Sequence, residues 1–187
     1  MQKTVIVING SGGVGKDTLC NMAAAHYAVR NISSITPIKE LAAACGWDGT
    51  KDDRSRKFLA DLKQLTIAYN DYPLHWLEGQ YRDFLQSDDE ILFVHIREPK
   101  EIEKFVRATD GHALTLLVRG GARYRNRRGK AAFGNAADDD VENYDYDYCF
   151  YNSRPLADTE PVFLRFLAKM LRQGHPDGKN GDADRKN

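Results

Sequence analysis

The hydrophobic positions of the chain form short apolar runs that alternate with amphipathic segments. Runs rich in β-branched residues are typical of buried parallel strands. We expect such strands at Thr4–Ile8, Ile32–Ile35, Ile91–Ile96, Ala113–Val118 and Tyr148–Tyr151. The segments between them have helical spacing and helix-start signals, and we expect helices at Thr18–Arg30, Ile38–Cys45, Asp52–Asn70, from Pro73 through Leu85, at Lys100–Ala108 and at Leu156–Arg172. The alternation predicts an α/β domain on a parallel sheet.

One region departs from strict alternation. Between the second and third expected strands, at about residues 37–87, helices follow one another with no strand between them. The longest of them spaces its apolar residues as one helical face, made of Phe58, Leu59, Leu62, Leu65 and Ala68. We expect this helical insertion to carry the site of a second substrate.

Composition places these elements in one domain. The 187 residues contain 42% hydrophobic and 29% charged residues, which suits a single globular core. We assign residues 1–173 to that domain and residues 174–187, rich in Gly, Asp, Lys and Asn, to a disordered tail. Twenty-seven basic residues offset twenty-seven acidic ones, so no global charge favours a nucleic acid or membrane partner.

Cysteine usage and the N-terminus bear on location. The three cysteines are odd in number and lack C-x-x-C spacing, which indicates neither a disulfide framework nor a zinc site. The apolar run Val5–Ile8 is too short for a secretory signal or a membrane span. The cytoplasm is the expected location.

A glycine-rich segment follows the first expected strand directly. It reads G-S-G-G-V-G-K-D from Gly10 to Asp17. Glycine permits positive φ and leaves backbone N–H groups open to a phosphate, and the helix that starts here directs its positive end at the same anion. A glycine-rich turn with a surface lysine is the alternative, but the strand before and the helix after favour a nucleotide site. The expected ATP-binding residues are Gly10, Gly12, Gly13, Val14, Gly15, Lys16, Asp17 and Thr18.

Asp17 is the unusual residue of this loop. Serine or threonine normally follows the lysine and contacts magnesium, whereas here Thr18 comes one residue later. The Asp17 carboxylate could reach a magnesium ion directly or through water, or accept the proton of an attacking oxygen. Alternatively, it is a first-turn acid that favours the helix dipole. We favour the functional roles and expect Asp17 to be a metal ligand and catalytic.

The loop and several later segments resemble known families. The pattern G-x-x-x-x-G-K-D-T resembles that of the phage-type deoxynucleoside monophosphate kinases and of the animal-type phosphomevalonate kinases. Further similar segments, looser but in the same order, are P-I-K-E at Pro37–Glu40, D-R-S-R-K-F-L at Asp53–Leu59, D-D-D-V-E-N at Asp138–Asn143 and Y-D-Y-C-F-Y-N at Tyr146–Asn152. The resemblance covers about the first 170 residues.

The resemblance implies a three-layer P-loop NTPase fold with a helical substrate-binding insertion and an arginine-rich lid. It implies ATP and Mg2+ as cofactors and a small phosphorylated acceptor as the partner, with a homodimer possible. Arg97, at the end of a predicted strand, would contact the acceptor's phosphate. Asn152 and Ser153 would lie near the donor base, and Asn152 therefore joins the expected ATP-binding residues.

The chain also departs from these families. The strand end that reads Asp-x-Arg in them reads His95-Ile96-Arg97 here. Magnesium prefers oxygen ligands, so His95 is a poor substitute for that carboxylate. Either Asp17 carries more of the metal site, or catalysis is weakened, or the chemistry differs. A buried, hydrogen-bonded structural histidine is an equally good interpretation.

Basic residues supply candidates for the acceptor site and the lid. Phosphoryl transfer needs positive charge along the path of the moving group. On the helical insertion, Lys39 and Arg56 are candidates for acceptor binding, with Arg54 a rival for Arg56. The segment Arg119–Lys130 holds six basic residues among glycines. A basic surface loop that contacts nucleic acid is the alternative, but the position after a strand favours a lid.

We place the lid at about residues 119–137 and take Arg123 and Arg127 as its catalytic arginines, beside Lys16 and Asp17. The aspartates at 138–140 are expected in a solvated turn or helix cap.

The favoured function is transfer of the γ-phosphoryl group of ATP to a small phosphorylated acceptor, first a (deoxy)nucleoside monophosphate. A phosphomevalonate-like acceptor and a nucleotide-binding regulatory protein with little turnover stay open. A GTPase is disfavoured because the sequence has no N-K-x-D motif. The aromatic pairs Tyr69/Tyr72 and Trp76/Tyr81 could stack on a base, but their helical spacing favours packing.

Overall fold

A five-stranded parallel sheet forms the centre of the computed structural model, which describes residues 3–121 and 140–176. The strands are β1 (Thr4–Asn9), β2 (Val29–Ser33), β3 (Ile91–His95), β4 (Leu114–Gly120) and β5 (Tyr148–Asn152). Their spatial order is β2-β3-β1-β4-β5, and every pair is parallel. The chain therefore switches sides of β1 between β3 and β4. In open α/β sheets, ligands bind at the carboxyl ends of the strands beside such a switch point.

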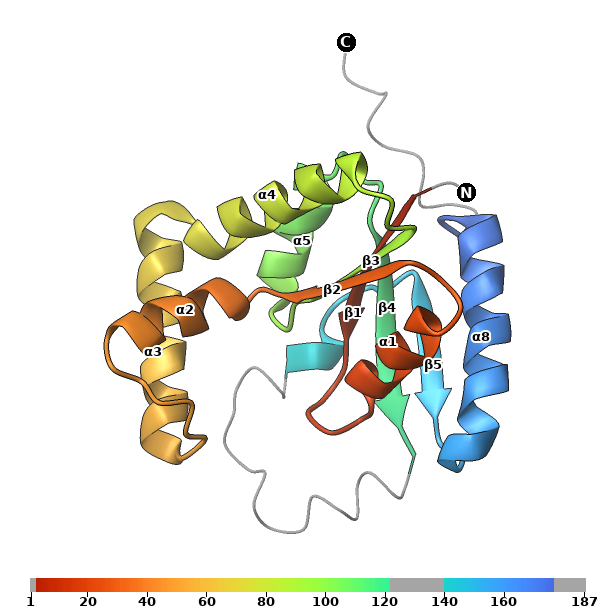
Figure 1. The fold of residues 1–187 in the computed structure, drawn as a ribbon, viewed down its shortest axis with the longest axis horizontal. Helices are drawn as coiled ribbons and strands as arrows, with labels where there is room; N and C mark the ends of the chain where they lie inside the picture. The colour runs from red at the N-terminus through yellow and green to blue at the C-terminus, as the bar shows by residue number, and fades with distance from the viewer. Residues whose placement is uncertain (1–2, 122–139, 177–187) are drawn as a thin grey trace.

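Helices cover both faces of the sheet (Figure 1). They are α1 (Lys16–Ala24), α2 (Thr36–Ala44), α3 (Asp53–Asn70), α4 (Tyr72–Gln86), α5 (Pro99–Ala108) and α8 (Leu156–Gln173), with a short 3-10 helix, η1, at Asp140–Glu142. Side chains alternate along β1, as a strand requires. Ile6 and Ile8 pack with α1 and α8, whereas Val5 and Val7 pack with α4 and α5. The result is a three-layer α/β/α domain.

This architecture confirms the predicted α/β fold, but it corrects two boundaries. The first helix ends at Ala24 rather than Arg30, and β2 begins at Val29 rather than Ile32. Val29 is already paired with Ile91 in the parallel ladder, so pairing with β3 outweighs local helix preference. Arg119, assigned to the lid by its basic neighbours, instead belongs to β4 and pairs with Tyr151.

Three helices, α2, α3 and α4, fill the segment between β2 and β3, as expected for the helical insertion. In Figure 1, α2 and α3 project beyond the sheet at the left of the view. The α3 helix begins at Asp52, whose carboxylate accepts a hydrogen bond from the Ser55 backbone at 2.7 Å, an N-cap arrangement.

The predicted apolar face of α3 is only partly buried. Leu59 and Leu62 are half-buried, whereas Leu65 is 67% exposed and Phe58 is 37% exposed. The fully buried residues of the helix are Ser55 and Lys63, so the side of α3 that meets the domain carries both polar and apolar residues. The aromatic residues Trp76 and Tyr81 of α4 pack against the core, and Tyr69 is exposed.

The cysteines Cys20, Cys45 and Cys149 are free thiols, and Cys20 is buried. Among the helices in the described part of the chain, none is both long and apolar enough to cross a membrane. Gly174 ends α8, and its carbonyl accepts a hydrogen bond from the Tyr148 hydroxyl. The rest of the predicted tail, from residue 177, lies outside the described residues.

Candidate functional site

The glycine-rich loop lies at the carboxyl end of the central strand β1 and leads into α1. Gly10, Gly13 and Gly15 have φ values of 148°, 79° and 94°, in the region that favours glycine. A Cβ on Gly10 would lie 2.4 Å from the carbonyl oxygen of Val118 on β4, so no larger residue fits there. Gly15 is the N-cap of α1, and no described side chain caps that helix start. A helix start directs its first backbone N–H groups and its positive end outward, which is the usual geometry of an anion site.

Lys16 and Val14 make the side-chain contacts that hold this loop in place. The Lys16 ammonium donates to the carbonyl of Gly10, and at 3.2 Å to that of Ser11. Val14 is only 5% exposed and packs into the core between α1 and the sheet. Its carbonyl accepts a 2.8 Å hydrogen bond from the Asn152 side chain. The loop is thus tied to the core by an apolar side chain and by β5.

Asn152, predicted near the donor base, is 4% exposed, and its amide contacts Val14 of the loop. Its carbonyl oxygen accepts a weaker hydrogen bond, at 3.4 Å, from Thr159 on α8. In this structure the Asn152 side chain thus holds the glycine-rich loop at Val14.

Asn9 is a residue of the site that the sequence analysis missed. It is fully buried at the end of β1, and its carbonyl oxygen accepts a hydrogen bond from the Gly10 N–H at 2.8 Å. Its amide donates to the Arg97 carbonyl at 3.0 Å and to the Tyr146 hydroxyl at 2.7 Å. Burial raises the pKa of Tyr146 to about 12, so this hydroxyl stays protonated and donates to the Val141 carbonyl at 2.8 Å. One side chain thus joins the phosphate loop to the end of β3.

Asp17 and His95 face one another across the start of α1. The Asp17 carboxylate is 89% exposed and lies 3.8 Å from the Nε2 atom of His95, which is 15% exposed. The same ring nitrogen lies 2.8 Å from the Asn31 amide oxygen and 3.8 Å from the Cys20 sulfur.

Burial governs the protonation of this group. It lowers the pKa of His95 to about 4, against the opposing influence of Asp17, while Lys16 and Arg97 act in the same direction as burial. His95 is therefore a neutral imidazole at neutral pH. Burial likewise raises the pKa of Cys20 to about 12, so its thiol is protonated.

The donor set allows one test of the expected magnesium site. Among residues 3–121 and 140–176, no three histidine, cysteine or acidic side chains gather as a metal cluster. Asp17 offers an exposed carboxylate at the end of the loop. Magnesium commonly takes one or two carboxylates and completes its shell with water and substrate phosphates, so the arrangement fits an ion bound together with a nucleotide.

A pocket of about 520 Å³ adjoins the loop on the side of β4 and β5. Ser11 and Val14 line it from the loop, and Arg119 and Tyr151 line it from the two strands. The Arg119 guanidinium donates to the Tyr151 hydroxyl at 3.0 Å and pairs with Glu142 at 3.3 Å. Its centre lies 5.9 Å from the Tyr151 ring. The sequence analysis assigned Arg119 to the lid, because it did not detect that β4 continues to Arg119 and pairs there with β5.

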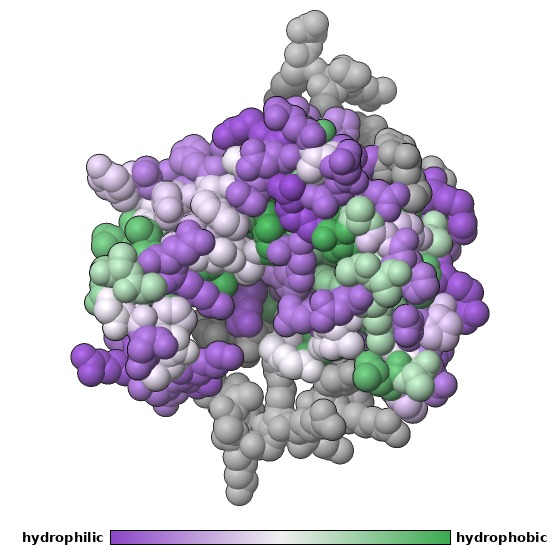
Figure 2. Space-filling view, viewed as in Figure 1, coloured by the Kyte–Doolittle hydropathy of each residue, from purple (hydrophilic) through white to green (hydrophobic). Residues whose placement is uncertain are grey.

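The predicted acceptor residues lie on different elements of the fold. Arg97 is exposed at the carboxyl end of β3, close enough for its charge to act on His95. Lys39 is exposed on α2. Arg56 is exposed on α3 and donates to Asp53 on its own helix at 3.0 Å. Arg123 and Arg127, the predicted lid arginines, lie outside the described residues. In the space-filling view, the surface is hollowed between α2 and α3 on one side and α1 on the other (Figure 2).

Comparison with known proteins supports the fold. No protein-family model matches the chain, and no curated protein matches it in sequence. Among solved structures, a candidate kinase from Chloroflexus aurantiacus j-10-fl has a TM-score of 0.52 and 16% identity, over 93% of this chain and 99% of that chain. The tunicamycin resistance protein of Deinococcus radiodurans has a TM-score of 0.55 and 13% identity, over 89% and 96% of the two chains. The chain therefore shares the α/β fold of these two structures.

Proposed function

We propose that this chain is an ATP-dependent phosphotransferase that moves the γ-phosphoryl group to a small phosphorylated acceptor, most directly a (deoxy)nucleoside monophosphate. The observation that carries the proposal is the loop Gly10–Asp17 at the carboxyl end of the central strand. Gly10, Gly13 and Gly15 adopt positive φ, no described side chain caps the helix start, and the Lys16 ammonium donates to the Ser11 carbonyl of the loop. The similarity to a candidate kinase supports the same class.

The donor nucleotide would lie across the loop and the adjoining pocket. The backbone N–H groups of Gly12 through Lys16 would hold its phosphates. The pocket beside them offers the Arg119 guanidinium and the Tyr151 ring, and both groups can stack on a base. Asn152 would act through Val14, because its amide holds that part of the loop.

The chemistry would rest on charges at the edge of the sheet. Lys16 would leave the carbonyls of Gly10 and Ser11 and neutralise charge on the transferring group. Asp17 would hold magnesium, and a bound magnesium ion supplies charge neutralisation between the phosphates. Arg97 would meet the acceptor's anionic group, with Lys39 and Arg56 further out on the helical insertion. The lid arginines would be Arg123 and Arg127.

One observation favours a second function, a nucleotide-binding protein with little turnover. His95 stands where the related families carry an aspartate, and burial keeps it neutral. A neutral imidazole supplies neither the charge nor the oxygen that would help to organise a magnesium water shell. A phosphomevalonate-like acceptor is the alternative within the kinase class.

Titration calorimetry with ATP and Mg2+ tests the central claim. We expect Lys16→Met to weaken ATP binding about a hundredfold, because the only side-chain cation of the loop is lost. The matched control is Lys169→Met, an exposed lysine on α8, which should leave the affinity unchanged. Equal affinity in wild type and Lys16→Met would contradict the proposal.

A coupled assay with a panel of nucleoside monophosphates, deoxynucleoside monophosphates and phosphomevalonate then separates the functions. Turnover of a nucleoside monophosphate supports the first choice, and turnover of phosphomevalonate alone supports the alternative acceptor. ATP binding without turnover of any acceptor supports the regulatory protein.

A further inference from the structure

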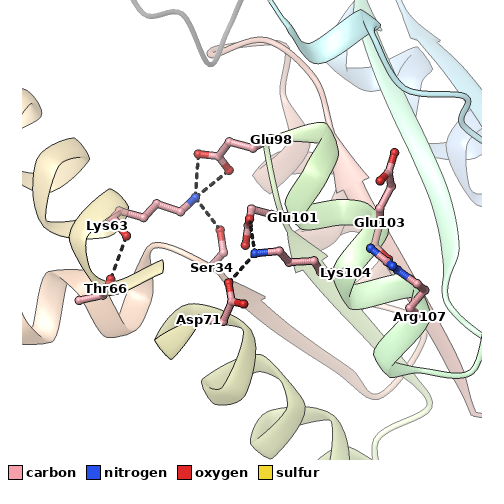
Figure 3. Close-up of polar contacts among 9 residues, drawn as sticks. All are labelled: Ser34, Lys63, Thr66, Asp71, Glu98, Glu101, Glu103, Lys104 and Arg107. Carbon is pink, nitrogen blue, oxygen red and sulfur yellow. Dashed lines mark hydrogen bonds and ion pairs between the residues drawn. The ribbon is translucent and has the colours of Figure 1, made fainter. Parts of the chain in front are cut away.

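An ion pair between a buried lysine and a partly exposed glutamate joins the helical insertion to the carboxyl edge of the sheet. Lys63 of α3 is 6% exposed, and its ammonium lies 2.7 Å from both carboxylate oxygens of Glu98. The third neighbour is the hydroxyl of Ser34, at 3.4 Å. Figure 3 shows the Lys63 side chain reaching from α3 toward these two groups. Lys63 is thus a charged residue held by partners that are far away in the sequence.

Both partners of Lys63 belong to the edge where ligands bind. Ser34 directly follows β2, and its N–H donates to the His95 carbonyl at 3.1 Å. Glu98 directly follows Arg97 and is the N-cap residue of α5. The Arg97 carbonyl in turn accepts the hydrogen bond from Asn9, which also holds Gly10. Polar contacts, joined by the Arg97–Glu98 peptide bond, therefore connect the glycine-rich loop to α3.

The Lys63–Glu98 pair is a directional contact between two particular side chains. A buried charge is costly unless it is paired, so the Lys63 ammonium strongly requires Glu98. An ammonium shared between two carboxylate oxygens has a narrow range of favourable geometries. Apolar packing is non-directional, and of the large apolar residues of α3, Leu59 and Leu62 are half-buried while Leu65 and Tyr69 face solvent. The ion pair therefore adds a directional contact to the partial apolar packing of α3.

We propose that Lys63 and Glu98 are a positioning pair for the acceptor site: the pair fixes α3 against the carboxyl edge of the sheet and thereby holds Arg97 where an anionic acceptor group meets it. The proposal rests on the proposed function for the role of Arg97. The link between α3 and the sheet stands on geometry alone, so the two parts can be tested separately.

A second ion pair nearby provides a matched control. Lys104 of α5 pairs with Asp71, between α3 and α4, and with Glu101 at 3.2 Å. It joins the same two parts of the molecule and appears beside the first pair in Figure 3. Its side chain is 29% exposed, compared with 7% for Lys63, and neither of its partners adjoins Arg97. Lys104→Met therefore removes a similar contact away from the edge.

The first experiment measures the placement of α3 in the full chain. Spin labels are attached at Ala60→Cys on α3 and Arg165→Cys on α8, both exposed, after replacement of Cys45 and Cys149 by serine. We expect pulsed electron resonance to give a narrow distance distribution in the parent and in Lys104→Met. Lys63→Met and Glu98→Gln should broaden it. A distribution that stays narrow in both of these variants would overturn the proposal.

The second experiment measures steady-state kinetics with ATP and each of dAMP, dCMP, dGMP and dTMP. We expect Lys63→Met and Glu98→Gln to raise the acceptor KM about tenfold, with the ATP KM changed less than about twofold. The exchanged pair Lys63→Glu with Glu98→Lys should recover part of the loss. Glu98→Gln keeps the size of the side chain, so it serves if Lys63→Met does not fold.

The outcomes distinguish the two hypotheses. Equal rises in the KM of both substrates, or no rise in either, would overturn the positioning role. If none of the four acceptors is turned over, the deoxynucleoside monophosphate acceptor fails, and the distance distribution alone decides whether the pair positions α3.

Discussion

The strands of the central sheet and the helix α3 are stabilised by different kinds of contact. In β1 and β3, residues such as Ile6, Phe93 and Val94 are fully buried among apolar neighbours on both faces. In α3 the large apolar side chains Leu65 and Tyr69 face solvent, and Lys63 is buried. The sheet is therefore stabilised mainly by removal of apolar surface from water, and α3 is held in part by an ion pair.

This difference bears on how each region is held in place. Apolar burial over two sheet faces gives the glycine-rich loop a firm base, because a close-packed core moves little. An ion pair holds α3 only in the geometry that satisfies both partners, so the loss of one partner removes the contact. The loop that would hold the donor is thus built on apolar packing, and the residues proposed for the acceptor lie beside a contact that a single substitution can remove.

The largest effect expected from this comparison is in the sheet. Leu92 on β3 is fully buried, so Leu92→Ala should lower the free energy of unfolding by about 2–5 kcal/mol through lost burial and a residual cavity. Urea denaturation followed by circular dichroism measures the loss. A change below about 1 kcal/mol would show that the sheet core relaxes around the cavity. The sheet and α3 would then differ less in the way they are stabilised.

An intermediate effect on the free energy of unfolding is expected from His95, the last residue of β3. The folded protein holds the pKa of His95 at about 4, compared with 6.5 for the ordinary side chain. Below pH 6.5 the unfolded chain binds a proton that the folded protein does not, so the free energy of unfolding should fall between about pH 6.5 and pH 4. The full loss would be about 3 kcal/mol, and no such change arises above pH 6.5.

Replacement of this residue tests the assignment. His95→Gln keeps a hydrogen-bonding group beside Asn31 and removes the titration, so its stability should depend less steeply on pH over the same range. Urea denaturation at pH 8, 6 and 4 gives the comparison, with pH 8 as the reference for each variant. Parallel profiles in the two proteins would show that His95 is protonated more easily than its burial implies.

The smallest effect is expected on the exposed side of α3. Leu65→Ala should change the free energy of unfolding by less than about 0.5 kcal/mol, because a side chain that is 67% exposed loses little burial. It is the matched partner of Leu92→Ala, since the same atoms are removed. A loss as large as that of Leu92→Ala would mean that this face of α3 is covered in solution.

The strands and the phosphate loop could be predicted from the sequence because their signals are local. Thr4–Ile8 is a run of β-branched residues, and the glycines at 10, 13 and 15 occupy positions where the backbone needs positive φ. Both properties depend on neighbouring residues only. The boundary between α1 and β2 was misplaced because strand pairing with β3, distant in the sequence, decides where β2 begins.

The supporting contacts of the site were not predictable in the same way. Asn9 meets Arg97 and Tyr146, and Asn152 meets Val14, across many intervening residues. The sequence around an asparagine at the end of a strand does not indicate which distant residues its side chain contacts. Arg119 was likewise placed by its basic neighbours, whereas pairing between β4 and β5 puts it in a strand beside the pocket.

The sequence by itself determined the order of strands and helices, the glycine-rich loop with Lys16 and Asp17, and the helical insertion, because periodicity and backbone requirements act over a few residues. Only the tertiary structure decided which face of α3 is buried. The apolar spacing of that helix predicted Leu65 inside, but Glu98 and Ser34 at the sheet edge supply partners for Lys63. A buried charge is stable only where such partners converge, and convergence is a property of the fold.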